Sequence, residues 1–512
     1  MLVNQFLEQS ARRHPDKVAL VTKEGRFSYR EIDEMANKVA NALIADRLEK
    51  GDRVAIFMDN SLEAVVGIFG VLKAGGIFLL INPTTKAEKL TYVLNNCRAS
   101  AFISVQSKLN MITEACNNTP SLRNIYLTGE RPQVVSDLHK KNFSFTEILR
   151  GSDGHKPPTR TIDVDLATII YTSGSTGNPK GVMMAHFNMV SAANSISTYL
   201  ENTPDDIIIN VLPISFDYGL YQILMGFKVG ATVILERSFL YPYKVIDTII
   251  KEKVTGFPIV PTISAILLQM DDLKKHNLEH LRYISNTAAA LPVAHIQKLR
   301  ESFPQTTVYS MYGLTECKRV SYLPPDQLDI RPTSVGKGMP NEEVYIVDED
   351  GNRVGPDVIG ELVVRGSNVM RGYWEMPEET AKRLRPGPYP GEMVLYTGDL
   401  FRMDEEGYLY FVARKDDIIK SRGEKVSPKE IENILYEIDE VVEAAVVGVE
   451  DAVLGQAIKA FVVLKDGSEL KEKEIIRFCS QHLEDFMVPK YIEFKNELPK
   501  TDTGKIKKTG LS

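Results

Sequence analysis

The sequence predicts an α/β protein, because strand-like and helix-like segments alternate over residues 1–165 and again after that point. Such alternation is typical of largely parallel sheets covered by helices on both faces. Residues 330–412 differ, since short strands between glycine and proline turns indicate a small β-rich subdomain. We therefore expect a large N-terminal domain, residues 1–414, with two α/β sheet subdomains and the β-rich one. A small α+β C-terminal domain, residues 415–512, is expected to follow.

Composition is that of a globular protein and excludes several classes of function. The 512 residues are 43% hydrophobic and 25% charged, and the net charge of −7 argues against a nucleic-acid-binding surface. The four cysteines are far apart, which fits a reducing compartment and argues against structural zinc. The N-terminus lacks the pattern of a signal peptide, and the longest apolar run, 64–83, is interrupted by Lys73 and two glycines. We expect no membrane span and a cytoplasmic location.

The first unit is expected to begin with a capped helix. Ser28 and Glu31 have the spacing of a capping box, and the helix that they open should run to about Ile44. Further elements follow from apolar runs of the appropriate length. They are strands over 54–58, 77–81 and 101–105 and a helix over 62–74.

A loop at 171–181, Tyr-Thr-Ser-Gly-Ser-Thr-Gly-Asn-Pro-Lys-Gly, follows a buried strand over 166–170 and precedes a helix over 188–200. Glycines let backbone N–H groups point at an anion, hydroxyl groups add donors, and Lys180 supplies positive charge. The loop is therefore expected to bind the phosphates of a nucleotide.

The spacing of the residues excludes two other kinds of loop, the Walker phosphate-binding loop and the nucleophile elbow of hydrolases. In a Walker loop the first glycine is followed by four residues and then by Gly-Lys. Here the position of that second glycine, five residues after Gly174, is occupied by Pro179. A hydrolase nucleophile elbow needs one more residue between Gly174 and Gly177. A flexible linker is disfavoured, because a strand leads directly into the loop.

The second unit has five strand-like segments, each followed by a turn of polar or small residues. They are 207–212, 231–235, 256–260, 281–285 and 307–310. In open α/β sheets ligands bind at the carboxyl ends of the strands, so functional residues are expected in the turns at 212–217, 286–290 and 311–316.

The remaining elements are shorter. Strands of the β-rich subdomain are expected at 343–347, 361–365, 392–396 and 407–412. In the C-terminal domain, Ser427, Pro428 and Glu430 predict the start of a helix. Strands over 441–449 and 457–464 and a helix over 472–486 should follow, ahead of a basic, turn-rich tail at 498–508.

Five segments together resemble the adenylate-forming superfamily, which includes acyl-CoA synthetases, peptide-synthetase adenylation domains and luciferases. The loop at 171–181 is similar to that family's phosphate loop, and Tyr312-Gly313-Leu314-Thr315-Glu316 to its Y-G-x-T-E element. Thr397-Gly398-Asp399 is similar to its T-G-D, 414–420 with Gly423 to its hinge segment, and 499–505 to its closing loop. The five occur in the family's order and span the chain.

The resemblance implies an ATP site. It assigns the β- and γ-phosphates to Thr172, Ser173, Gly174, Ser175, Thr176, Gly177 and Lys180. It places Ala288, Ala289, Ala290, Met311, Tyr312 and Gly313 around the adenine, with Asp399 on the ribose hydroxyls and Arg414 on the ribose or α-phosphate. Glu316, with Thr176, would hold Mg²⁺, a hard cation that prefers oxygen ligands.

The implied chemistry is in-line attack by a carboxylate on the α-phosphorus of ATP, with pyrophosphate leaving. Lys505, Thr315 and Glu316 would be catalytic, and Lys505 would bridge the two reacting anions. No histidine base is needed, because a carboxylate is ionised at neutral pH.

A thiol would then attack the acyl-adenylate, from coenzyme A or from the phosphopantetheine of a carrier protein acting in trans. Between the halves the mobile C-terminal domain would turn about Asp416, withdrawing Lys505 and presenting Lys420, a further cofactor-binding residue.

The acid is expected to bind near Phe216, Asp217 and Asn286. Many acyl-CoA synthetases of the family carry histidine where Phe216 stands, whereas peptide synthetases carry Phe-Asp, whose Asp binds an α-amino group. Asp217 thus indicates an amine-bearing substrate, or it caps a turn or meets a lysine of the fold. Tyr218-Gly219 favours the acyl-CoA synthetase side. Lys425 departs from the family by standing where arginine is frequent.

Two activities therefore remain open. One is an acyl-CoA or acyl-carrier ligase for a small or medium carboxylic acid, and the other is a stand-alone amino-acid adenylating enzyme that loads a carrier protein. An inactive scaffold is disfavoured by the presence of the implied catalytic residues, and nothing supports a luciferase-like oxygenase. Cys317 is not expected to be a nucleophile, because no base accompanies it in sequence.

Overall fold

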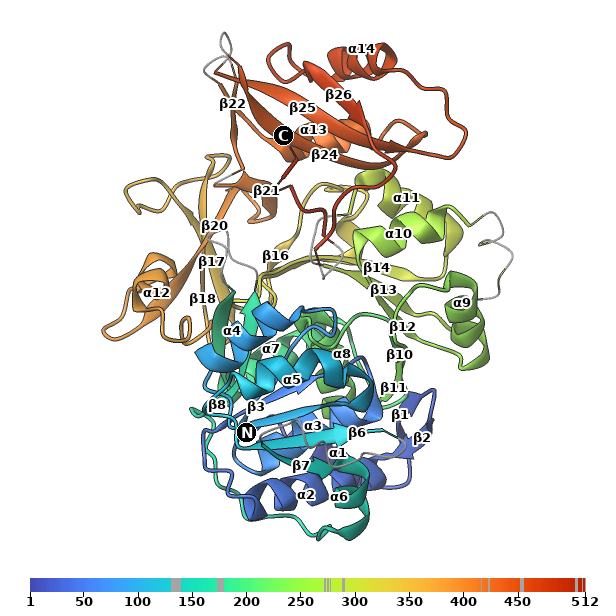
Figure 1. Ribbon diagram of the computed structural model, residues 1–512. Coiled ribbons are helices and arrows are strands. Elements are labelled where there is room, and N and C mark those ends of the chain that lie inside the picture. Colours follow the sequence, from blue (N-terminus) through green and yellow to red (C-terminus); the bar gives the residue numbers. More distant parts are fainter. Residues whose placement is uncertain are drawn as a thin grey trace.

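The computed structural model describes residues 1–129, 140–172, 179–270, 273, 276, 278–287, 291–415, 417–421, 424–451, 455–501, 505–508 and 510–511. These residues form four β-sheets with helices packed on them (Figure 1). The predicted fold class is confirmed, with two α/β sheets, a small β-sheet and a C-terminal α+β unit.

One sheet of seven strands is built from the first unit and the phosphate-loop region. In spatial order its strands are β7 (Lys141–Ser144), β6 (Asn124–Thr128), β5 (Ala101–Val105), β3 (Arg53–Phe57), β4 (Ile77–Leu80), β8 (Leu166–Thr172) and β9 (Lys180–Ala185). Its helices are α2 (Tyr29–Ala45), α3 (Leu62–Lys73), α4 (Ala87–Asn96), α5 (Leu109–Asn117) and α6 (Phe145–Gly151), with a short 3₁₀ turn at Gln106–Lys108. All neighbouring strands are parallel except β8 and β9.

Helices cover both faces of this sheet, as predicted. Successive side chains of a strand point to opposite faces, and in β3 Val54 and Ile56 join one hydrophobic cluster while Ala55 and Phe57 join another. The first cluster contains α2 and α3, and the second contains α4 and α5. The Ser28–Glu31 capping box opens α2 as expected.

A second sheet of nine strands carries most of the turns in which functional residues were expected. Its order is β16 (Lys337–Gly338), β15 (Ser321–Leu323), β14 (Thr307–Tyr312), β13 (Tyr283–Asn286), β12 (Gly256–Ile259), β10 (Ile207–Asn210), β11 (Thr232–Leu235), β1 (Val18–Thr22) and β2 (Gly25–Ser28). Its helices are α1 (Gln5–Arg13), α7 (His186–Tyr199), α8 (Asp217–Val229), α9 (Pro242–Lys251), α10 (Pro261–Leu268) and α11 (Val293–Ser302), with a 3₁₀ turn at Pro325–Gln327. In spatial order, the six neighbouring strands from β14 to β1 are parallel to one another. Strands β2, β15 and β16 are antiparallel to their neighbours.

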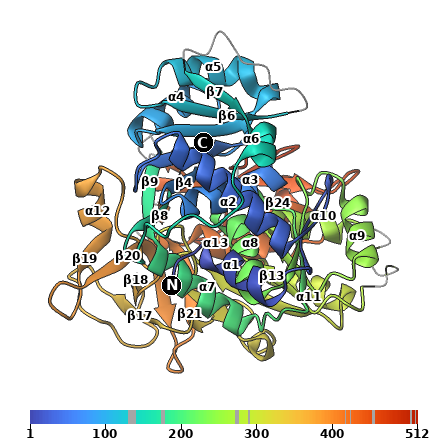
Figure 2. The same ribbon diagram turned by 90° about the horizontal axis from the view of Figure 1, so that it is seen from below.

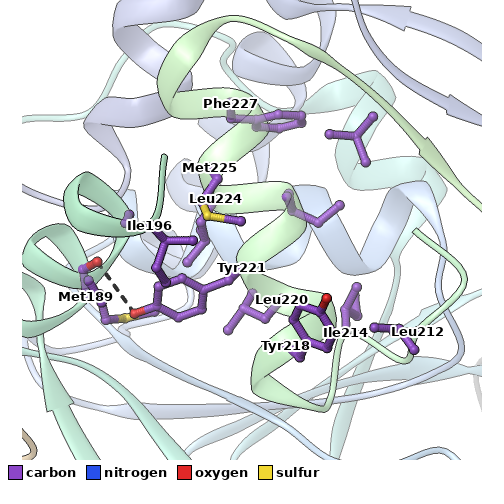
Figure 3. Packing of buried hydrophobic residues seen from close by; sticks show 14 of the residues in the cluster. Met189, Ile196, Leu212, Ile214, Tyr218, Leu220, Tyr221, Leu224, Met225 and Phe227 are labelled. Atoms are coloured by element: carbon purple, nitrogen blue, oxygen red, sulfur yellow. Dashed lines mark hydrogen bonds between the residues drawn. The ribbon is translucent and has the colours of Figure 1, made fainter. Parts of the chain in front are cut away.

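Helices α3 and α8 are the buried centre of the molecule. Both are buried along nearly their whole length, and Phe69 of α3 stacks on Phe227 of α8 with ring centroids 5.4 Å apart. Figure 2 shows the two helices at the centre, with α4 and α5 beyond the seven-stranded sheet. Figure 3 shows the packed side chains of α8, among them Tyr218 and Tyr221. The Tyr221 hydroxyl donates to the backbone carbonyl of Met189 in α7.

The phosphate loop joins two antiparallel strands, which the sequence pattern did not reveal. Strand β9 was not predicted, and it pairs antiparallel with β8. Residues 371–374 lie along the outer side of β9, where the backbone N–H of Met183 donates to Gly372 and that of Trp374 donates to Gly181. The loop residues 173–178 themselves lie outside the described residues.

The small third sheet contains β17 (Glu342–Val347), β18 (Gly360–Gly366), β20 (Met393–Met403), β19 (Leu384–Pro386) and β21 (Leu409–Arg414), with α12 (Pro377–Arg383) beside it. Strand β20 is longer than predicted, so Thr397-Gly398-Asp399 lies inside a strand. In the pairing of β20 with β21, Asp399 stands directly opposite Arg414.

The C-terminal unit is a sheet of β23 (Glu424–Val426), β22 (Ile419–Ser421), β25 (Gly455–Leu464), β24 (Val441–Asp451) and β26 (Tyr491–Phe494), with α13 (Pro428–Leu435) and α14 (Glu472–His482). Ser427 precedes α13, but its side chain does not cap the helix as the pattern predicted. Its hydroxyl donates instead to the carbonyl of Val412 in β21, at 2.5 Å, and so ties the two units together.

A second tie joins the C-terminal unit to α11 of the nine-stranded sheet. The Lys298 ammonium lies 2.9 Å from the Asp439 carboxylate, and the rings of His295 and Tyr436 meet edge to face. Within the described part of the chain, no helix has the length and apolar character needed to cross a bilayer.

Candidate functional site

A buried carboxylate in β20 is the first element of the site. Asp399 is only 7% exposed. Its Oδ2 accepts a 2.5 Å hydrogen bond from the Tyr312 hydroxyl, and its Oδ1 lies 3.7 Å from Nε of Arg414. Gly398, just before it, has φ +75°, a conformation that favours glycine. Two segments far apart in the sequence, β14 and the paired strands β20 and β21, therefore meet at this carboxylate.

Burial raises the pKa of Asp399, and the nearby Arg414 and Tyr312 oppose this shift. A carboxylate has about four acceptor positions, so the contacts with Tyr312 and Arg414 leave room for further donors. Two vicinal hydroxyl groups, such as those of a ribose, are donors of this kind.

The Tyr312 ring lies at the carboxyl end of β14. It packs edge to face on Phe401, with centroids 4.9 Å apart, and also meets Phe411. Met311 beside it is buried. Gly313, which follows, has no room for a side chain, because a Cβ there would lie 2.3 Å from the carbonyl oxygen of Lys318. The aromatic ring is therefore held rigidly.

Glu316 is connected to the phosphate-loop hairpin through Tyr373. The Tyr373 hydroxyl donates to Oε1 of Glu316 at 2.7 Å. The ammonium of Lys180, at the start of β9, lies 5.6 Å from the Tyr373 ring centroid and pairs with Glu379 at 2.5 Å. The lysine that was expected to hold phosphate and the carboxylate that was expected to hold metal thus both contact Tyr373, and the lysine has a protein counter-ion.

Lys505 reaches this cluster from the C-terminal tail. In Figure 1 the dark red final segment descends from the C-terminal sheet towards β14 and β16. The pKa of Lys505 is lowered by burial and by Arg414, and the carboxylates of Asp217, Asp399 and Glu316 act in the opposite direction. One lysine therefore lies within electrostatic range of all three carboxylates.

Asp217 is the first residue of α8 and is 6% exposed. A carboxylate in the first turn of a helix is stabilised by the helix dipole. Two cations of the chain, Lys505 and Lys318, interact electrostatically with it. Phe216 precedes it as the helix N-cap residue, and its ring meets that of Tyr218 edge to face.

The other predicted residues are placed as follows. Thr172 ends β8, Asn286 ends β13 and is buried, and Thr315 lies in the turn after β14. Lys420 lies in β22 of the C-terminal sheet. Ser173, Gly174, Ser175, Thr176, Gly177, Ala288, Ala289, Ala290 and Asp416 lie outside the described residues.

Three buried side chains at the site were not singled out from the sequence. Tyr373 orients Glu316, while Lys318 and Arg319 are buried cations in the turn after β14. The Lys-Arg pair at 318–319, two residues after Glu316, was a visible signal, because two adjacent cations followed by strand β15 must either be solvated or bind something. Tyr373 gave no signal, since its role depends on pairing between residues 371–374 and β9.

The donor set fits a magnesium ion that is bound mainly through a substrate. Among the described residues there is no cluster of three or more acidic, histidine or cysteine side chains that could enclose a metal. Mg²⁺ in nucleotide sites is commonly held by one or two carboxylates together with phosphate oxygens. The Glu316 carboxylate, oriented by Tyr373, suits that role.

Comparison with known proteins agrees with this geometry along the whole chain. The AMP-binding enzyme family matches residues 7–374, and the AMP-binding enzyme C-terminal domain matches residues 430–505. The chain is 33% identical to a long-chain-fatty-acid–CoA ligase of Bacillus subtilis, covering 98% of this chain and 93% of that protein. It is 28% identical to a linear gramicidin synthase of Brevibacillus parabrevis, covering 100% of this chain and 10% of that much longer protein.

Solved structures give the same result. The anthranilate CoA ligase AuaEII in complex with anthranoyl-AMP superimposes with a TM-score of 0.91 at 30% identity, covering 100% of this chain and 96% of that one. ATP-bound MatB from Rhodopseudomonas palustris superimposes with a TM-score of 0.86 at 30% identity, covering 100% and 98%. The chain therefore belongs to the AMP-binding enzyme family and is an AMP-forming acid–thiol ligase.

Proposed function

We propose that this chain activates a small carboxylic acid with ATP and Mg²⁺ and transfers the acyl group to the thiol of coenzyme A. The observation that supports this most directly is the position of Lys505. A lysine from the C-terminal tail lies within electrostatic range of Glu316, Asp399 and Asp217, which come from three different parts of the N-terminal region.

In the first half-reaction a carboxylate oxygen of the acid forms a bond with the α-phosphorus, and the bond from that phosphorus to the bridging oxygen of pyrophosphate breaks. Both reactants are anions, so the main task of the protein is to neutralise and position them. Lys505 would lie between the acid and the α-phosphate. Asp399 would accept the ribose hydroxyls while Tyr312 covers the adenine, and Arg414 would lie beside the ribose or α-phosphate.

Glu316 and Lys180 would serve the departing pyrophosphate. A Mg²⁺ ion held by Glu316 would neutralise phosphate oxygens, and Tyr373 keeps this carboxylate in place. Lys180 would exchange its contact with Glu379 for a phosphate oxygen, because both are anionic partners of the same ammonium. The loop 173–178 between β8 and β9 would add backbone and hydroxyl donors.

In the second half-reaction the thiol sulfur would form a bond with the acyl carbon, and the acyl–oxygen bond to AMP would break. The arrangement with Lys505 at the site belongs to the first half-reaction. For the second, the C-terminal domain, residues 415–512, would turn about Asp416 and bring the region of Lys420 to the site. A carrier-protein phosphopantetheine is the alternative acceptor.

Amino-acid adenylation is the weaker alternative, since two lysines of the chain, Lys318 and Lys505, lie within electrostatic range of Asp217. A substrate amine would have to compete with both. A cationic group is therefore not required to balance this carboxylate.

Acid-dependent exchange of pyrophosphate into ATP, measured over a panel of carboxylic and amino acids, tests the first half. Formation of thioester with coenzyme A tests the second. Lys505→Ala should lower exchange at least about 100-fold while sparing thioester formation from supplied acyl-adenylate. Lys507→Ala, in the same tail but exposed, is the matched control and should leave both rates unchanged. Absence of exchange with every acid would refute the proposal, and equal loss of both half-reactions in Lys505→Ala would refute the assigned role of Lys505.

A further inference from the structure

The turn between β14 and β15 buries two adjacent cations. Lys318 is 2% exposed and Arg319 is 3% exposed. The backbone of this turn is fixed from behind, because the Asn368 amide donates to the carbonyl oxygens of Cys317 and Arg319. The two side chains are therefore presented from a rigid loop at the carboxyl end of the nine-stranded sheet.

Arg319 uses only part of its hydrogen-bonding capacity within the protein. Its Nη1 donates to the carbonyl of Lys318 at 3.0 Å. Its Nε and Nη2 are buried and have no hydrogen-bond partner of good geometry among the described residues, and the Tyr199 hydroxyl is the polar group that lies near the guanidinium. These two nitrogens form one edge of the guanidinium, whose parallel N–H bonds match the two oxygens of a carboxylate or phosphate.

The surroundings of Arg319 are aromatic rather than acidic. Its Cζ lies 4.5 Å from the ring centroid of Tyr218, and its charge lowers the pKa values of Tyr199, Tyr218 and Tyr221, against the upward effect of their burial. None of the ion pairs formed by the described residues includes Arg319. The guanidinium thus has no anionic partner in the part of the protein that the structure describes.

Lys318 connects this cation to the reaction site. Its Nζ also has no hydrogen-bond partner among the described residues. It lies 5.7 Å from the ring centroid of Tyr221, and Asp217 and Glu316 are its acidic neighbours. These two carboxylates also act on Lys505, so Lys318 and Lys505 share the same acidic neighbours.

The charges in this region do not balance. Asp217 can offset one of the two buried cations, and Glu316 is assigned to the metal. A buried charge without a counter-charge is costly, and arginine cannot lose its proton to avoid that cost. An anionic group on a bound ligand would remove the imbalance.

We propose that the acid activated by this chain carries a second anionic group, in its simplest form a second carboxylate, and that Nε and Nη2 of Arg319 bind that group. The inference rests on the proposed function and names the substrate class for the same site. The reacting carboxylate lies by Lys505, and the second oxyanion lies by Arg319. Two cations and several tyrosine hydroxyl groups are a poor environment for the apolar end of a fatty acid.

The experiment compares exchange of pyrophosphate into ATP for α,ω-dicarboxylic acids and for monocarboxylic acids of equal length. Carboxylic acids that carry a phosphonate instead form a third series, which separates the two sources of a second oxyanion. The wild-type enzyme should prefer at least one dianionic series over the monocarboxylic acids by about 100-fold or more in kcat/KM, because an analogue without the bound group leaves the guanidinium unpaired.

Arg319→Leu should remove most of that preference, lowering kcat/KM for the dianionic acid about 100-fold while changing that for the monocarboxylic acid much less. Arg331→Leu is the matched control, because Arg331 also lies over a tyrosine ring, that of Tyr408, but pairs with Asp404 away from the site. This variant should keep the wild-type preference. A purely structural role of Arg319 would lower both activities equally.

Preference of the wild-type enzyme for monocarboxylic acids, or equal losses in Arg319→Leu, would overturn the inference and leave the proposed function intact. If no acid supports exchange, the proposed function fails, and calorimetric titration of the same diacids into the protein decides the inference by itself. Binding that Arg319→Leu abolishes would support it, and absence of binding to the wild-type protein would overturn it.

Discussion

Removal of the Tyr373 hydroxyl tests how far the orientation of Glu316 matters for catalysis. In Tyr373→Phe the ring remains and the 2.7 Å hydrogen bond to Oε1 of Glu316 is lost. A hydrogen bond to a charged group contributes about 1.5–3 kcal/mol. About 1.4 kcal/mol corresponds to a factor of ten in rate, so kcat/KM for ATP should fall about 10- to 100-fold if this contact is needed in the transition state.

The assay is exchange of pyrophosphate into ATP, measured against Mg²⁺ concentration at saturating acid. If Glu316 holds the metal, Tyr373→Phe should need more Mg²⁺ for half-maximal rate, because its carboxylate is no longer oriented. A role of Tyr373 in packing alone would lower stability without changing the Mg²⁺ dependence.

Tyr126→Phe is the matched control for this experiment. The Tyr126 hydroxyl also donates to a carboxylate at 2.7 Å, that of Asp46 at the end of α2, remote from the site. This variant should lose stability and keep wild-type kinetics. Wild-type kinetics in Tyr373→Phe, or equal kinetic losses in the two variants, would refute the reasoning.

Three further variants test other parts of the structure. Asp399→Asn should abolish the preference for ATP over 2′-deoxy-ATP, which we expect to be about 10- to 100-fold in the wild-type enzyme; an undiminished preference would show that Asp399 does not bind the ribose. Lys180, together with Lys382, lowers the pKa of Glu379 to about 2, so the contribution of these pairs to stability is present above about pH 4.5 and is lost as the pH falls through about 2. Glu379→Gln should therefore flatten the dependence of the melting temperature on pH in that window, and an unchanged profile would contradict the pairing. Gly219→Ala would put a Cβ 2.3 Å from the Pro213 carbonyl oxygen and should reduce the free energy of unfolding in urea by about 1–3 kcal/mol; no loss would mean that the turn relaxes freely.

The elements that the sequence predicted well are those with a strong local pattern. Strand β5 and the capped helix α2 were found because their apolar spacing and capping residues are sufficient by themselves. Strand β9 was missed because it begins with Lys180 and Gly181, residues that are read more readily as part of the loop. The extension of β20 through Gly398 and the addition of β1 and β2 to the distant nine-stranded sheet depend on tertiary pairing, which local propensity does not encode.

In the candidate site, too, some features could be predicted from local sequence and others depend on tertiary contacts. The identities of Asp399 and Tyr312 came from resemblance to a family, and their contact across 87 residues of sequence could not be derived from either segment alone. Whether Asp217 faces a substrate or the protein depends on Lys318, whose burial was not evident before the turn after β14 was seen. Local sequence therefore identified the chemical groups, and the fold determined which of them share a charge environment.

The pairing of residues 371–374 with β9 has a consequence beyond catalysis. Strand β9 is the last in its sheet, and an uncovered edge strand offers its backbone groups to other polypeptides, which promotes aggregation. The segment that covers this edge also carries the Tyr373 hydroxyl to Glu316. Protection against self-association and the orientation of the Glu316 carboxylate thus depend on the same four residues, so a change that loosens the segment is expected to reduce solubility and activity together.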